Sequence, residues 1–415
     1  MTTRQDISVY AHWKGMPAPK CIGELTINQI RGKRAVNFTF QPDWINTHDQ
    51  FLLDPDLSWY SGPQFPASKE NFGMFLDSMP DTWGRTLMKR RAAIQAREIG
   101  KPVPFLHDTD YLLGVHDICR MGALRFKTDP AGDFLDNDPV NPTPPWANIR
   151  ELQYSAEAIE SGNESGDIKK WLKILIAPGS SLGGARPKAN IMDTDGHLWI
   201  AKFPSGNDQV NKGAWEYLSN ALARDAGIEV AESRLEHITG KHDTFFTKRF
   251  DRDKSDRIHF ASAMTMTGKT EELIRDKTPS YLDIVEFIQF YGVNVEVNLH
   301  QLWRRIIFNI LISNTDDHLR NHGFILTEAG WTISPAYDLN PSTDKAGLAL
   351  NIDMNNNTAD VELAISVGAY FRLNEKSMNN ILSEAKLAVS GWQKLAKQLG
   401  IPRGEQLLMA AAFRV

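Results

Sequence analysis

The amino-acid sequence predicts an α+β protein with a β-rich N-terminal part and a helical C-terminal part. Within residues 5–40, apolar and polar residues alternate, as in Ile7–Ala11 and Val36–Phe40, and turn residues separate these runs. Such alternation is typical of strands with one buried face. After residue 279 the apolar residues recur at helical spacing, and we expect helices at 280–291, 297–313, 358–370, 374–399 and 403–413.

The composition predicts a soluble globular protein. Of the 415 residues, 42% are hydrophobic and 23% are charged, and the net charge of −5 argues against nucleic-acid binding through overall charge. Cys21 and Cys119 lack the spacing of a zinc site or a disulfide framework. The N-terminus has no apolar signal region, and no run of 18 apolar residues occurs, so we expect a cytoplasmic location without membrane contact.

Three regions are expected along the chain, at 1–145, 146–278 and 279–415. The first boundary falls at the end of residues 128–146, which hold five prolines and four aspartates and therefore read as a linker. Before it, an amphipathic helix is predicted at 79–98, with Ser78 or Asp81 as its N-cap.

The middle region is predicted to be rich in strands. Lys188–Met192 and Leu198–Phe203 read as paired strands around the turn Asp193–Gly196. A helix is expected at 213–226, ending before Gly227, and further strands are expected at 229–239 and 243–250.

A run of small residues lies just before the first of these strands, at Ser180–Lys188. Small residues allow backbone N–H groups to approach phosphate oxygens closely. The run does not match the G-x-x-x-x-G-K-[ST] pattern of a Walker loop, and taken alone it favours a plain glycine turn between strands.

Lys202 lies on the second strand, where alternation places it on the same face as Leu198 and Ile200. A lysine on a buried face needs an anionic partner. In kinases this position belongs to the strand lysine that contacts the ATP phosphates and pairs with a helix glutamate. Glu216, in the following helix, is the candidate partner.

The densest polar segment is Asn314–His322, which follows an apolar helix and precedes the expected strand Gly323–Leu326. Asp316 and Asn321 have the five-residue separation of the catalytic aspartate and the metal-binding asparagine in a kinase catalytic loop. Asp338 ends the hairpin expected after Asn321, where a kinase places its second magnesium-binding carboxylate.

These four features occur in the order found in kinases, and together they predict a phosphoryl-transfer site in a bilobal protein-kinase-like fold. The combination resembles the HipA-type serine/threonine kinases, the toxins of bacterial type II toxin–antitoxin systems. The resemblance rests on Ser181–Lys188, Lys248–Arg252, Asn314–Asn321 and Ser334–Leu339. The N-terminal β-rich region also resembles the corresponding subdomain of that family.

The resemblance implies a role for each matching residue, with ATP as co-substrate and Mg²⁺ as metal. Asp316 resembles the catalytic base, and Asn321 and Asp338 resemble the metal ligands. The implied nucleotide-binding residues are Gly183, Gly184, Ala185, Arg186, Pro187, Lys188, Lys202, Lys248, Arg249, Phe250, His318 and Tyr337. Ser181, or its neighbour Ser180, matches the serine that these kinases autophosphorylate. At Lys248, the type member of the family carries an acidic residue instead.

The resemblance also implies partners. These are a small helix-turn-helix antitoxin of the HipB kind, which contacts operator DNA, and a protein substrate of the aminoacyl-tRNA synthetase class. Two alternatives stay open from the sequence. One is a kinase-fold enzyme that phosphorylates a small molecule, and the other is an inactive kinase-fold co-repressor.

Overall fold

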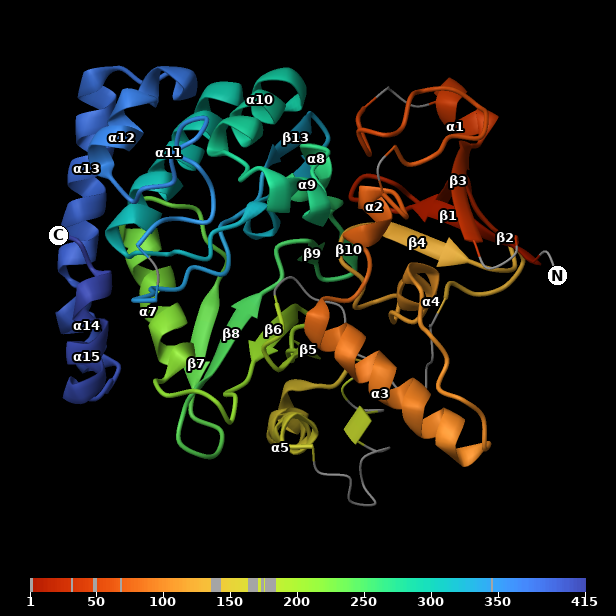
Figure 1. The fold of residues 1–415 in the computed structure, drawn as a ribbon, viewed down its shortest axis with the longest axis horizontal. Helices are drawn as coiled ribbons and strands as arrows, with labels where there is room; N and C mark the ends of the chain where they lie inside the picture. The colour runs from red at the N-terminus through yellow and green to blue at the C-terminus, as the bar shows by residue number, and fades with distance from the viewer. Residues whose placement is uncertain are drawn as a thin grey trace. The chain divides into compact units, whose positions relative to one another are not determined.

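The computed structural model describes residues 3–30, 33–47, 51–67, 69–135, 143–162, 171–172, 175, 184–344 and 346–415. The chain divides into two compact units. Unit 1 comprises Met1–Ile200 and Asp251–Ala261, and unit 2 comprises Ala201–Phe250 and Ser262–Val415. Helices and antiparallel strands occur in both, so the predicted α+β class is confirmed (Figure 1). The three region boundaries expected from the sequence stay a prediction.

Unit 1 begins with an antiparallel sheet in the strand order β3-β2-β1-β4. Its strands are β1 (Thr3–Ala11), β2 (Lys20–Ile30), β3 (Lys33–Phe40) and β4 (Leu124–Lys127). Because side chains alternate along a strand, Ile7, Val9 and Ala11 share one face, and all three are fully buried. They belong to a core that includes Phe38. The strands predicted within residues 5–40 are therefore confirmed.

Unit 1 contains further elements besides this sheet. They are α1 (Pro42–Thr47), α2 (Gly73–Leu76), α3 (Thr82–Glu98), α4 (Asp108–Leu113), α5 (Ile149–Glu160), β5 (Lys188–Met192), β9 (Arg252–Asp253) and β10 (Asp256–Arg257). Strand β6 (Leu198–Lys202) starts in unit 1 and ends in unit 2, and β11 (Phe260–Ser262) likewise crosses the boundary. Both strands around the turn Asp193–Gly196 were predicted.

Helix α3 is fixed at its N-terminus to the start of β5. Of the two predicted caps, Asp81 is the one used, because its Oδ1 accepts a hydrogen bond from the Gly84 N–H at 2.9 Å. Its other oxygen accepts from Lys188 Nζ at 2.6 Å, and the Trp83 indole donates to the Lys188 carbonyl at 3.0 Å. The Lys188 side chain is only 2% exposed, so Asp81 balances a buried charge.

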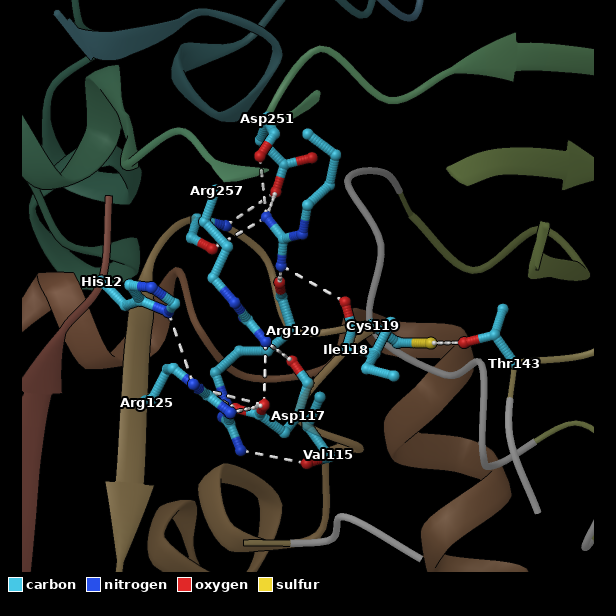
Figure 2. Close-up of polar contacts among 12 residues, drawn as sticks. His12, Val115, Asp117, Ile118, Cys119, Arg120, Arg125, Thr143, Asp251 and Arg257 are labelled. Atoms are coloured by element: carbon cyan, nitrogen blue, oxygen red, sulfur yellow. Dashed lines mark hydrogen bonds and ion pairs between the residues drawn. The ribbon is translucent and has the colours of Figure 1, made fainter. Parts of the chain in front are cut away.

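A second buried charge network holds residues 251–261 within unit 1 (Figure 2). Asp251 accepts a hydrogen bond from the Gly122 N–H at 2.8 Å, and Arg257 donates to Asp117 at 2.8 Å. Arg125 donates to the same Asp117 carboxylate. Burial alone would raise the pKa of Asp117, but the two arginines lower it overall. The segment that follows Phe250 is therefore anchored by buried ion pairs.

Unit 2 is mainly helical. Its helices are α7 (Lys212–Asp225), α8 (Ala263–Met266), α9 (Glu271–Asp276), α10 (Tyr281–Tyr291), α11 (Val295–Leu311), α12 (Val361–Ser366), α13 (Glu375–Ser390), α14 (Trp392–Gln398) and α15 (Arg403–Met409). Its strands include the antiparallel pairs β7 (Ser233–Glu236) with β8 (Thr244–Lys248) and β12 (Gly323–Thr327) with β13 (Gly330–Ile333).

The helices expected in unit 2 are present with shifted ends, except that the range 358–370 holds only the short helix α12, followed by a 3-10 turn at Gly368–Phe371. The apolar face of α11 is fully buried at Leu302, Trp303 and Ile306, which explains its strong sequence signal. The helix expected at 374–399 is divided at Gly391 into α13 and α14. In the part of the chain that the structure describes, no helix is both long and apolar enough to cross a membrane.

We predict that Asp81→Ala lowers the free energy of unfolding by about 3–5 kcal/mol, because the buried Lys188 ammonium loses its carboxylate. Loss of the α3 cap contributes about 1 kcal/mol of this. Chemical denaturation measures the change. The double variant Asp81→Ala with Lys188→Met should regain part of the loss, since no buried charge is then left unpaired. A double variant less stable than Asp81→Ala would contradict this account of the pair.

Candidate active site

Lys202 ends strand β6 and lies between two carboxylates. Its ammonium donates to Glu216 Oε1 at 2.5 Å and to Asp338 Oδ1 at 2.7 Å, and its side chain is 7% exposed. Burial alone would lower the pKa of Lys202, but Asp338 and Glu216 raise it well above its ordinary value. Lys202 therefore stays charged at physiological pH. The pairing with Glu216 that the sequence predicted is present.

Glu216 is presented by the first turns of α7. The N-cap of the helix is Asn211, whose side-chain oxygen accepts a hydrogen bond from the Ala214 N–H. Gly227, two residues after the last helical residue, adopts the left-handed conformation with a φ of 77°. Gly213 packs against the Asp243 backbone, and a Cβ there would lie 2.4 Å from its carbonyl oxygen. This close approach fixes the helix, and with it Glu216, against the chain before β8.

Asp338 follows the β12–β13 hairpin on a segment that is held at several points. The Ser334 N–H donates to the Gly323 carbonyl, and Arg305 of α11 donates to the Ser334 carbonyl at 2.5 Å. The Ala336 N–H donates to the Glu229 carbonyl at 2.8 Å. Asp338 itself adopts a left-handed backbone conformation with a φ of 59°, which is uncommon outside glycine. Strained backbone of this kind persists where the surroundings enforce it.

The segment Asn314–His322 begins with a chain reversal directly after α11. Ser313 is left-handed, with a φ of 50°, and the Asn314 side chain donates to Asn309 Oδ1 at 3.1 Å. Asp316 then lies at the surface. Within the described residues its carboxylate has no hydrogen bond or ion pair, while its carbonyl accepts from the Asn321 side chain at 3.0 Å. The backbone of Asp316 is thus held and its carboxylate is left available.

The neighbouring Asp317 has the opposite environment. Its carboxylate is buried, and Oδ2 accepts hydrogen bonds from Tyr281 at 2.5 Å, from Asn309 at 2.7 Å and from His322 at 2.8 Å. Burial alone would raise the pKa of Asp317, but His322 and the hydrogen bonds lower it overall. Asp317 therefore ties the loop to α10 and α11.

The remaining site residues of unit 2 lie on β8 and around Tyr337. The Lys248 N–H donates to the Glu232 carbonyl at 2.8 Å, and Arg249 is buried. The rings of Phe250 and Tyr337 lie 5.7 Å apart, and the Tyr337 hydroxyl donates to the Arg320 carbonyl at 2.7 Å. His318 is half-buried; in the described structure its Nδ1 is buried without a hydrogen-bond partner.

The nucleotide loop expected from the sequence is described only from Gly184 onward. Ser180, Ser181 and Gly183 lie outside the described residues. Gly184, Ala185, Arg186, Pro187 and Lys188 belong to unit 1. The Lys188 ammonium donates to the Gly184 carbonyl at 2.8 Å as well as to Asp81, so Lys188 makes structural contacts that the sequence did not indicate.

Sequence reasoning gave no role to Asp317, nor to its partners Tyr281 and Asn309. It also missed Arg414, whose Nε donates to Ser313 Oγ at 2.9 Å. No local pattern indicates these contacts, because Arg414 is about a hundred residues from Ser313 along the chain. The one available signal was the pair of adjacent aspartates, of which the structure exposes Asp316 and buries Asp317.

Comparison with known proteins places the chain in a family. Residues 180–392, a little over half of the chain, match the family described as the HipA-like C-terminal domain. The chain belongs to this family.

Two curated relatives of this HipA-like chain carry kinase names. It is 28% identical over 179 residues to a "Putative kinase" of Haemophilus influenzae, covering 39% of this chain and 52% of that protein. It is 23% identical over 247 residues to "Putative kinase Y4mE" of Sinorhizobium fredii, covering 53% of this chain and 51% of that protein. The chain thus spans about half of the length of these relatives.

A solved structure shares the fold of the HipA-like chain. It is a chain from the Shewanella oneidensis MR-1 complex of HipA, HipB and operator DNA. The TM-score is 0.65 at 18% identity, and the match covers 98% of this chain and 94% of that chain. The predicted HipA-like fold is therefore confirmed.

The two adjacent aspartates should respond differently to substitution. We predict that Asp317→Ala lowers the free energy of unfolding by about 3–5 kcal/mol, because three buried donors lose their shared acceptor. Asp316→Asn should change it by less than about 0.5 kcal/mol, as expected for an exposed side chain. Denaturant titration of both variants measures the contrast.

The pH dependence provides a control for Asp317. Its pKa in the folded state lies below the ordinary value of 3.8, so its stabilisation is full above about pH 4 and is lost as the pH falls through the folded-state pKa. The difference between wild type and Asp317→Ala should therefore shrink only in strong acid. Equal stability of the two proteins at pH 7 would contradict the anchoring role.

Proposed function

We propose that this HipA-like chain is an ATP-dependent serine/threonine protein kinase. The observation that carries the proposal is the buried Lys202 ammonium between Glu216 and Asp338. In kinases, a lysine paired with a helix glutamate binds the nucleotide phosphates, and a nearby aspartate binds the metal. The kinase names of the two curated relatives support the same activity.

Asp316 is the proposed catalytic base. Its exposed carboxylate is accessible to a substrate hydroxyl, whereas Asp317 is committed to three hydrogen bonds. In the proposed reaction, the serine or threonine oxygen attacks the γ-phosphorus of ATP and its proton passes to Asp316. The bond to the bridging oxygen breaks, and ADP leaves.

Asn321 and Asp338 are the proposed ligands of Mg²⁺. Both offer oxygen donors, which Mg²⁺ prefers. The Asn321 amide nitrogen is used in its hydrogen bond to the Asp316 carbonyl, which leaves the side-chain oxygen as the donor for a cation. Bound Mg²⁺ neutralises phosphate oxygens.

By resemblance to the family, the proposed nucleotide-binding residues are those of the glycine loop, Gly183–Lys188, together with Lys248–Phe250, His318 and Tyr337. The tilted ring pair of Phe250 and Tyr337 supports an aromatic wall for the base. Lys188 is the weakest member of this set, because its ammonium already has two partners.

We further propose that the kinase is the toxin of a toxin–antitoxin pair and modifies Ser181 or Ser180 in its own loop. A phosphate there adds about −1.5 to −2 charges beside the nucleotide phosphates, which would oppose ATP binding. A HipB-like antitoxin is the proposed partner, because the structural relative was solved with HipB and operator DNA. The proposed substrate is a cytoplasmic protein of the aminoacyl-tRNA synthetase class.

Incubation with ATP and Mg²⁺, followed by mass-spectrometric mapping of phosphoserine, tests the activity. We expect phosphate at Ser181 or Ser180 in the wild type. Asp316→Asn should reduce the rate of its incorporation by about 10²–10⁴-fold, because the proton acceptor is lost. Asp344→Asn, which changes an exposed aspartate elsewhere in unit 2, is the matched control and should label as the wild type does. Undiminished labelling of Asp316→Asn would overturn the assignment of the base.

A further inference from the structure

Unit 1 exposes a cluster of large apolar side chains directly after α3. Ile99 is 65% exposed, Val103 is 62% exposed and Phe105 is 79% exposed. These residues lie within seven positions of one another, on the segment that leads from α3 to α4 (Figure 1). Single exposed apolar residues are common, but three of them on one short segment make this part of unit 1 a candidate interaction surface.

The segment 101–107 has no regular secondary structure, and its sequence restricts its shape. Pro102 and Pro104 fix their own φ angles and disfavour helical conformations at the residues before them. The Phe105 ring packs edge-on against His107, with the ring centroids 4.7 Å apart. Val103 and Phe105 are therefore presented by a stiff strap, which reduces the entropy lost when a partner binds.

A hollow of about 370 Å³ lies between this strap and α3. Met88, Ala92 and Ala96 line it from the helix, and Pro102, Pro104 and Leu106 line it from the strap. A volume of this size accommodates one large apolar side chain with its neighbouring backbone.

Two cations line the same hollow. Arg91 projects from α3 and Lys101 begins the strap. Within the described residues, neither side chain makes a hydrogen bond or an ion pair, although the chain carries a net charge of −5. Two cations without intramolecular partners beside an apolar hollow are complementary to a ligand that is both apolar and acidic.

We propose that the hollow between α3 and the 101–107 strap is a docking site for an acidic protein segment that inserts one large apolar side chain. The apolar anchor would occupy the space between Ala92 and Leu106, and flanking carboxylates would pair with Arg91 and Lys101. The site uses none of the residues proposed for phosphoryl transfer.

A nucleic acid fits this surface less well. The walls of the hollow are aliphatic, whereas single strands are held by several stacked aromatic side chains. The surface therefore favours a protein segment, and nucleic-acid binding becomes an outcome of the test.

The test uses fluorescence anisotropy of the full chain with synthetic probes. The first probe is a labelled peptide of about 12 residues with one tryptophan flanked by glutamates. A second peptide replaces the glutamates by glutamines, a third replaces the tryptophan by alanine, and the fourth probe is an oligothymidylate of the same length. We expect saturable binding of the first peptide. Each of the other probes should bind at least about tenfold more weakly.

Matched variants locate the site. The double variant Arg91→Glu with Lys101→Glu should weaken binding of the first peptide by about tenfold or more, because attraction becomes repulsion. Lys394→Glu with Arg403→Glu changes two exposed cations of α14 and α15 by the same charge and should bind as the wild type does. Ala92→Trp fills the hollow without altering charge and should also abolish binding.

The proposal would be overturned if the first peptide showed no saturable binding up to about 1 mM. It would also be overturned if the two double variants bound that peptide equally, or if the oligothymidylate bound more tightly than the peptide. Because no variant touches the phosphoryl-transfer residues, kinase activity stays as an independent readout. Loss of docking with retained autophosphorylation would leave the proposed enzyme function intact.

Discussion

A buried ammonium group is the constraint on which the candidate site depends. Removing Lys202 from water is unfavourable unless anionic partners surround it, and Glu216 and Asp338 supply two. The three side chains come from the end of β6, from α7 and from the segment after β13. Each of these is fixed by its own contacts, including the close approach at Gly213 and the Arg305 bond to Ser334. The buried Lys202 ammonium therefore stabilises the one arrangement of these three segments that brings both carboxylates to it.

The proposed catalytic loop contains two carboxylates in opposite environments. One is buried and fully hydrogen-bonded, and the other is exposed to solvent. Asp317 gathers hydrogen bonds from α10 and α11 and holds the loop rigid. This leaves Asp316 exposed, with only its carbonyl engaged. A reactive side chain on a loop keeps its geometry only if its neighbours supply the rigidity. The pair of aspartates is thus one functional unit with two different tasks.

Local patterns predicted much of this arrangement, and long-range contacts explain what they missed. Alternation along β6 predicted the buried face of Lys202, and the helix that follows offered Glu216. The break of the expected helix 374–399 at Gly391 was missed, because the residues on both sides keep the same apolar spacing. The contacts of Lys188 with Asp81, and of Arg414 with Ser313, cross about a hundred residues of chain. Spacing within a motif carries no information about such partners.

The central claim is that Lys202 binds the phosphates of ATP, and calorimetric titration with Mg-ATP tests it most directly. The variant to use is Lys202→Met combined with Glu216→Gln, because it removes the ammonium without leaving Glu216 charged and unpaired. Lys241→Met, at an exposed lysine between β7 and β8, is the control. The account predicts that the control binds as the wild type does and that the double variant, folded at the temperature of the titration, binds at least about tenfold more weakly. Wild-type affinity in the folded double variant would contradict it.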